Sequence, residues 1–544
     1  MDKQVEIDNS SITKPASRVM FGGILSLVVS LASNIIVAYI FGAGSSMDAY
    51  LTAIVIPSYL QIVFYSSLAF VVIPAFIEAK TNKQDEDAWA LVGTFFWITL
   101  IVLSLISVLG SVFSTPLIKL VAPGFQDAKS TLASQMLTIS IFTMPFIGLS
   151  TLSTGIQNAR HRFFWPSFAP AFGSLTNVVI LLLFSRFIGP MALCWGFLFS
   201  AVVQSGFTII PIIFHGWKKL LPLSDRRVRN IGKLMTPLLL FGIVTCLSPV
   251  ALRYFSSSLP NGQIAYMGYA NKISSIFVLL LASGIAAAIF PSMARTYAQE
   301  GILGLSQKSD FGLRLTFAVA LPAILIVGAV AIPLIRVFFE RGAFTQSDTS
   351  GVNSILFAYL LGDVLFRMLG NIFDRGFYTL KNTITPMVIS SIYVILFIAT
   401  AHFFVTRWGY VGLVWALITS QGLDALTAGI IVYRKYPKGH GIRLTASFLK
   451  YFLVAGVSFI CVRFALFLLA KFSVYIQLAI GGLIGGLAYF FVLLFIDKEM
   501  LTSIFELFGI HYDFRKFKLG FEGIIPHKGS PDQIRRVGDD KTNL

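Results

Sequence analysis

Two short stretches of sequence decide the fold: GPMALCW at Gly189–Trp195 and GYVGLVW at Gly409–Trp415. Both begin with glycine, carry leucine at the fifth position and end in tryptophan, and they lie 220 residues apart (409 − 189). Each of them opens a long apolar run. Self-similarity at so long a period indicates that the chain contains an internal repeat.

Four further matches keep nearly the same separation, between about 216 and 221 residues. They pair Pro166 with Pro386, Gly155 with Gly376, Ala49–Tyr50 with Ala265–Tyr266, and Ile73–Pro74 with Phe290–Pro291. Chance does not hold one offset at five places, so we expect two related halves.

The composition places this repeat in a membrane. Of the 544 residues 56% are hydrophobic and 12% are charged, whereas a soluble domain carries about 25% charged residues. A bilayer core of about 30 Å requires about 20 apolar residues per helix. We therefore predict about fourteen transmembrane helices, near residues 18–41, 49–77, 88–113, 131–155, 166–186, 189–214, 234–254, 264–293, 312–338, 350–374, 385–405, 409–433, 446–470 and 474–496.

The predicted fold is an all-α polytopic membrane protein built as six plus six plus two helices. The two halves share one orientation, because an even number of spans separates them, and a pseudo-two-fold axis along the membrane normal then relates them. Such lobes enclose a cavity that opens to each side in turn. The predicted parts are a polar N-terminal arm (1–17), an N-lobe (18–214), a basic linker (215–233), a C-lobe (234–433), a second linker with two extra helices (434–496) and a polar tail (497–544).

In a soluble protein, a net charge of +17 would suggest a nucleic-acid partner. Here the basic residues lie mainly in short loops, and we expect no nucleic-acid partner. If the N-terminus is cytoplasmic, few lysines and arginines remain in the outside loops. These are Lys119, Lys129, Arg186, Arg336, Arg341, Arg407 and Lys471. The positive-inside rule therefore predicts that both termini are cytoplasmic.

The sequence favours a transporter over an enzyme. It contains no HExxH, GxSxG or GxxxxGK[ST] motif, and we expect no catalytic residue, no metal site and no cofactor. Cys194, Cys246 and Cys461 lie far apart inside apolar runs, which is typical of buried free cysteines. A cation-coupled small-molecule antiporter, a membrane glycosyltransferase and a non-transport scaffold remain alternatives.

Ionisable residues inside the spans are the candidate functional residues, because a charge at the bilayer centre costs about 2.5–3.5 kcal/mol and normally faces the bundle interior. Lys272 has no acid nearby in its own helix and is the leading candidate. Asp363 and Arg367 lie four apart on one helix face, where they bind cargo or simply neutralise one another. Arg253 either binds an anion or snorkels to the outer headgroups, and Asp48 either gates the cavity or caps its own helix.

Several motifs resemble the MurJ/MviN family. They are Phe41–Gly44, Asp48–Tyr50, Val72–Phe76, Ala122–Phe125, Leu334–Phe344 and Arg375–Pro386, and the resemblance covers roughly residues 15–496. It implies the multidrug/oligosaccharidyl-lipid/polysaccharide exporter fold, a bacterial inner-membrane location, and flipping of lipid II from the inner to the outer leaflet. It also implies a groove for the lipid tail at the two extra helices. The implied partners are a polyprenyl-pyrophosphate-linked glycan, membrane lipids and cell-wall synthesis machinery.

The cavity residues depart from the family pattern. Where that pattern has arginines in the first two spans this chain has Leu27, Ser33 and Gln61, and Asn34 stands where an aspartate is common. In the eighth span, Asn271–Lys272 stands where the family usually has an Asp-Arg pair, whereas Asp48 is retained. From the in-span charges we expect that Lys272, Arg253 and Arg367 bind substrate. Asp48, Asp363, Asn34, Asn271 and Gln61 would set cavity charge or gating. Another polyprenyl-pyrophosphate glycan is an alternative cargo.

Overall fold

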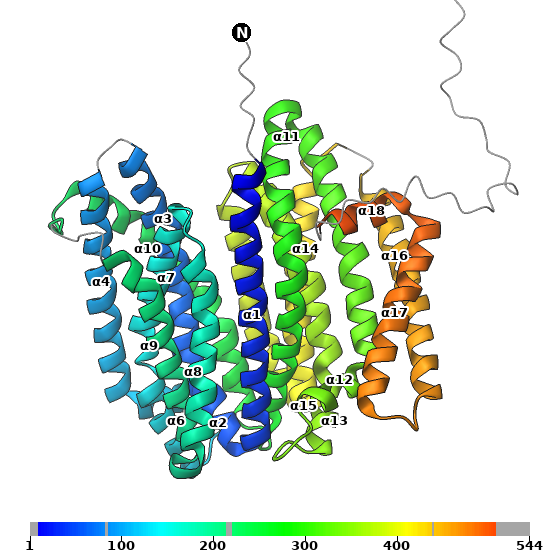
Figure 1. Ribbon diagram of the computed structural model, residues 1–544, viewed down its shortest axis with the longest axis horizontal. Coiled ribbons are helices and arrows are strands. Elements are labelled where there is room, and N and C mark those ends of the chain that lie inside the picture. Colours follow the sequence, from blue (N-terminus) through cyan, green and yellow to red (C-terminus); the bar gives the residue numbers. More distant parts are fainter. Residues whose placement is uncertain (1–8, 82–84, 214–219, 438–439, 508–544) are drawn as a thin grey trace, which may run out of the picture.

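The computed structural model describes residues 9–81, 85–213, 220–437 and 440–507. Within these ranges every regular element is a helix. Figure 1 shows the long helices running side by side, nearly parallel, with several short helices gathered at one end. We call this the distal end, and the end that holds the start of the first helix the N-terminal end.

The first half of the chain forms nine helices. Their bounds are α1 Asn9–Phe41, α2 Ser45–Ala53, α3 Val55–Thr81, α4 Asp85–Val112, α5 Ser114–Val121, α6 Asp127–Ser140, α7 Thr143–Ala159, α8 Phe164–Ile188 and α9 Met191–Ile213. Helices α2 and α6 lie at the distal end (Figure 1), and α6 continues into α7 as one candidate span, Asp127–Ala159. We refer to this half as the N-lobe.

The second half repeats the pattern, and three helices follow it. The C-lobe consists of α10 Arg226–Ser256, α11 Gln263–Ala329, α12 Ala331–Phe338, α13 Gln346–Tyr359, a π-helical segment Leu360–Phe366, α14 Arg367–Thr379 and α15 Ile384–Tyr433. The final helices are α16 His440–Leu468, α17 Val474–Ile496 and α18 Lys498–Leu507. Figure 1 places α16 and α17 together at the outer side of the C-lobe.

Two of these helices are hairpins. Gly409 has φ 60° and ψ −145° inside α15, and Ser390 donates a hydrogen bond of 3.0 Å to Asp424 across it. A straight helix would separate those residues by about 51 Å at 1.5 Å per residue. Gly301, with φ 66° and ψ −146°, turns α11 in the same way.

The number of membrane spans agrees with the sequence. Twelve helices of the described residues are long and apolar enough to cross a bilayer. Division of α15 at Gly409 and inclusion of α3, which is 27 residues long, bring the number to about fourteen. Large apolar side chains remain exposed on these helices, Phe467 at 78% and Phe495 at 68% among them. Such a surface is suited to lipid rather than water.

Three boundaries differ from the predicted ones. Helix α1 begins at Asn9, so half of the predicted polar arm (1–17) is helical. Helix α10 begins at Arg226, inside the predicted linker (215–233), because Asp225 caps it by accepting a 2.8 Å hydrogen bond from the Arg227 backbone. The predicted tail opens with α18, whereas the tail after Leu507 lies outside the described residues.

The repeat is visible in the backbone. His161 and Lys381, 220 residues apart, are the non-glycine residues with positive φ in the described chain, and both have φ 57°. Each follows the end of a helix at the N-terminal end. Arg162 N donates to Gln157 O, and Asn382 N donates to Phe377 O, both at 2.9 Å. These bonds define the same left-handed cap at both positions.

The glycines of the opening motif behave in the same way. Gly189 has φ 56° and ψ −137°, nearly the values of Gly409. Both turn the chain at the distal end in a conformation that a Cβ atom disfavours. Gly42 and Gly262 form a third pair with positive φ at the same separation. The matched glycines of the sequence therefore reflect matched turns.

Candidate functional site

A buried carboxylate joins the two lobes at the distal end. Asp48, on α2, is fully buried. Its Oδ2 accepts a hydrogen bond from Gly262 N and its Oδ1 accepts one from Ala265 N, both at 2.8 Å. These amides open α11 of the C-lobe, where unpaired N–H groups favour an anion. Lys129 Nζ, on α6, pairs with the same carboxylate at 2.8 Å.

Further contacts between the lobes surround this carboxylate. Tyr269 donates to Gly42 O at 2.8 Å, and Ala343 N donates to Tyr39 O at 2.9 Å. The backbones of the two lobes approach closely here. A Cβ atom added to Gly42 would lie 2.3 Å from Ala343 O. Lys129 Nζ also donates to Asn261 Oδ1 at 3.0 Å. The distal end of the molecule is therefore closed.

The alternative reading of Asp48 as the cap of its own helix is wrong. Gly44 is the N-cap residue of α2, and it makes no side-chain capping bond. Asp48 instead caps a helix that begins more than 200 residues later. The sequence places its partner Lys129 only in an outside loop, because nothing in the local sequence links the two positions.

Lys272 lies about 14 Å along α11 from Gln263, at 1.5 Å per residue. Its side chain and that of Asn271 are exposed. No acidic partner contacts the Lys272 ammonium within the described part of the chain. It is therefore an accessible cation without an acidic partner in the described residues.

Asp363 connects this region to the neighbouring C-lobe helix. It lies in the π-helical segment and is 4% exposed. It accepts a hydrogen bond of 2.7 Å from Arg367 Nη2 and one of 3.3 Å from Asn271 Nδ2. Arg367 is 55% exposed, so one face of its guanidinium stays available. The predicted Asp363–Arg367 pair exists, and Asn271 extends it into a network.

Arg253 is partly exposed and lies near the distal end of α10. Its Nε and Nη1 atoms are buried and have no hydrogen-bond partner. Its neighbours include Tyr59 of the N-lobe, Tyr359 of the C-lobe and Asp48. The guanidinium thus lies in the interior, beside the closed distal contacts. Two buried N–H donor atoms without partners are costly, and an anion would satisfy them.

The N-lobe contributes neutral groups to the interior. Asn34 Nδ2 donates to Ser30 O at 2.8 Å, within its own helix. Ser33 accepts a 2.9 Å hydrogen bond from Asn177 on α8. The side chain of Gln61, predicted to tune the cavity, lies outside the described residues. Among the candidate residues whose side chains are described, the cations therefore come from the C-lobe.

Two repeated lobes of long apolar helices that contact each other closely at one end define a membrane transporter of the alternating-access kind. Its family follows from comparison: the family model described as "Lipid II flippase MurJ" matches residues 37–475. The match spans most of the chain, so the chain belongs to this family.

Curated relatives extend the match to nearly the full length. The probable lipid II flippase MurJ of Buchnera aphidicola is 26% identical over 520 residues, which cover 91% of this chain and 99% of the relative. The corresponding Vibrio cholerae protein is 28% identical over 463 residues, or 80% of this chain and 85% of its own.

Solved structures share the fold. A lipid II flippase MurJ in an inward closed conformation superposes with a TM-score of 0.74 at 22% identity, covering 90% of this chain and 98% of the other. An inward-facing multidrug resistance MATE family transporter of the MOP superfamily reaches a TM-score of 0.64 at 15% identity, covering 78% and 95%. The predicted exporter fold is confirmed.

Proposed function

We propose that this protein flips lipid II, the polyprenyl-pyrophosphate-linked peptidoglycan precursor, from the inner to the outer leaflet by alternating access. The family and the curated relatives, named lipid II flippases, support this cargo. The observation that carries the mechanism is Lys272, an accessible cation at mid-depth without an acidic partner. A transporter of an anionic headgroup needs such a group, whereas a helix packing surface does not.

The pyrophosphate would contact the cations of the C-lobe. Arg and Lys form strong charge-assisted hydrogen bonds with phosphate oxygens. Lys272 is free to do so, and Arg367 offers the donors that Asp363 leaves unused. Arg253 has two buried donor atoms without partners, so an anion that reached the distal part of the interior would satisfy them.

Asp48 would act as the gate. Opening of the distal end requires that its carboxylate lose the amides of Gly262 and Ala265. Lys129 belongs to the same lobe as Asp48 and stays with it, which keeps the carboxylate compensated in both states. Breaking two hydrogen bonds to a charged group costs a few kcal/mol, at about 1.5–3 kcal/mol each, and cargo binding would offset that cost.

We place both termini in the cytoplasm of a bacterium, with the distal end at the outer face of the inner membrane. The distribution of lysine and arginine supports this orientation. The closed distal end then corresponds to a state that receives cargo from the inside. The division into an N-lobe (18–214) and a C-lobe (234–433) fits the same scheme.

A second candidate cargo is another polyprenyl-pyrophosphate-linked glycan. The observation that favours it is the neutral N-lobe interior, where Ser33 and Asn34 bond to protein groups. With cations on one lobe only, the site would form fewer hydrogen bonds with a pyrophosphate. It would then discriminate among glycans by other contacts.

Complementation distinguishes the two cargoes. The chain is expressed in one strain depleted of its lipid II flippase and in another that lacks a polysaccharide flippase, with membrane levels measured in both. Growth of the first strain supports lipid II as the cargo. Rescue of the second strain alone would assign the chain to a different glycan.

A further inference from the structure

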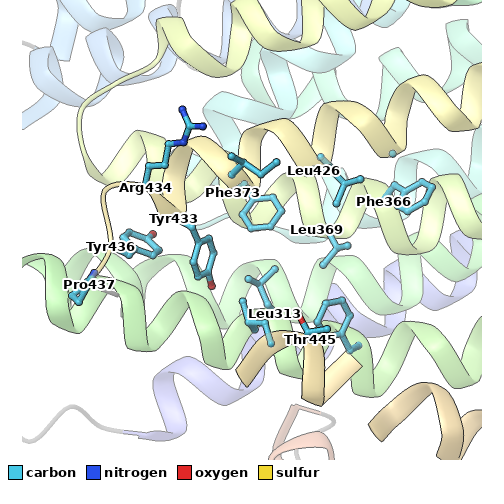
Figure 2. A pocket seen from close by; sticks show the side chains of 16 residues that line it. Leu313, Phe366, Leu369, Phe373, Leu426, Tyr433, Arg434, Tyr436, Pro437 and Thr445 are labelled. Atoms are coloured by element: carbon cyan, nitrogen blue, oxygen red, sulfur yellow. The ribbon is translucent and has the colours of Figure 1, made fainter. Parts of the chain in front are cut away.

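A cavity lies on the C-lobe, and none of its lining residues belongs to the N-lobe. It has a volume of about 620 Å³ and lies among α11, α14, α15 and the start of α16. Figure 2 shows Phe366, Leu369, Phe373 and Leu426 at one end and in the middle of it. The volume is in the range of ligand-binding pockets, about 300–1,000 Å³. Since Leu426 is 60% exposed, the apolar end borders the lipid-facing surface.

The other end of the cavity is polar and basic. Figure 2 shows Arg434, Tyr433, Tyr436 and Pro437 grouped there. Tyr433 donates its hydroxyl proton to Asp310 of α11. Tyr436 is hydrogen-bonded to Ser309 of α11 at 2.9 Å. Both aromatic walls are thus held in place by the facing helix, and the pocket is preformed.

Arg434 itself is available. It follows the last residue of α15, its side chain is exposed, and no acidic residue of the described ranges pairs with it. Lys435 adds a second positive charge beside it. The pocket therefore has a basic mouth at the N-terminal end of the helices and an apolar interior that extends toward mid-membrane. A lipid with an anionic headgroup has the same polarity along its length.

We propose that this pocket binds an anionic phospholipid, with its phosphate on Arg434 and one acyl chain among Leu313, Phe373 and Leu426. Charge complementarity at the mouth selects an anionic over a zwitterionic headgroup. The site is distinct from a groove formed by the two extra helices, because α16 contributes only Leu444 and Thr445 and α17 contributes no lining residue. The inference does not depend on the transported cargo.

The test uses the purified full-length chain in detergent, with phosphatidylglycerol or phosphatidylcholine added. Thermal unfolding and native mass spectrometry report stabilisation and retained lipid. We expect phosphatidylglycerol to raise the unfolding midpoint and to be retained, and phosphatidylcholine to do neither. Arg434→Gln should remove most of that stabilisation, whereas Lys435→Gln, beside the pocket, should keep most of it.

A second pair of variants tests the apolar end. Leu426→Trp fills the pocket from its lipid-facing side and should reduce phosphatidylglycerol retention. Leu453→Trp is the matched control, since Leu453 of α16 is also 60% exposed and does not line the cavity. Equal stabilisation of the wild type, Arg434→Gln and Leu426→Trp would overturn the proposal. Stabilisation by undecaprenyl pyrophosphate but not by phosphatidylglycerol would overturn it as well.

Discussion

Asp48 Oδ1 accepts a hydrogen bond of 2.8 Å from the backbone N–H of Ala265, a residue 217 positions further along the chain and in the other lobe. This contact closes the distal end. The repeat pairs Ala265 with Ala49, the residue that follows Asp48 in the sequence. The amino-terminal turn of α11 is thus held by a side chain of the N-lobe.

Substitution of Asp48 by Asn should open the distal end. The amide keeps an acceptor for one backbone N–H but leaves Lys129, which is 9% exposed, as an uncompensated cation. Removing one partner of a buried pair costs about 3–5 kcal/mol. We expect faster labelling of cysteines introduced at the distal contacts and loss of complementation. Asp127→Asn, at an exposed position in the first turn of α6, is the control and should label as the wild type does.

Lys272→Ala should abolish complementation at normal membrane levels, and Lys272→Arg should retain part of it, because the cation rather than the exact side chain is required. Ser275→Ala, one turn further along α11 and bonded only to its own helix, serves as the control. Growth supported by Lys272→Ala as well as by the wild type would refute the role of this cation in cargo binding.

Gly409→Ala should destabilise the protein by about 1–3 kcal/mol, the cost of a strained backbone conformation. The effect is conformational, since no atom lies within 4 Å of the added Cβ. Gly456→Ala, also without neighbours but at an ordinary helical position, should be neutral or slightly stabilising. Thermal unfolding of the two variants in detergent compares them, and equal midpoints would contradict the backbone argument.

His161→Gly and Lys381→Gly should each stabilise the protein slightly. Both residues have φ 57°, where glycine is favoured and other residues cost about 1 kcal/mol. Similar gains at the two sites are expected, because the two caps have the same hydrogen bonds. A marked loss of stability at either position would show that its side chain makes a contact more important than the backbone preference.

The sequence predicted most of the fold because the relevant signals are local. Apolar runs of sufficient length become spans in a bilayer regardless of what surrounds them, and the glycines at positions 189 and 409 mark turns that few other residues can make. It also predicted the Asp363–Arg367 pair, since residues four apart on a helix are neighbours. The start of α1 at Asn9 was missed because polar residues carry no span signal.

Only the tertiary structure decided which distant groups meet. The partners of Asp48, the burial of two Arg253 nitrogen atoms and the tyrosines that hold the pocket beside Arg434 all depend on contacts between helices separated by many residues in the sequence. Hydrophobicity and turn chemistry determine where each helix begins and ends. The packing of one helix against another determines which side chains face an internal space, and that depends on the shapes of both surfaces together.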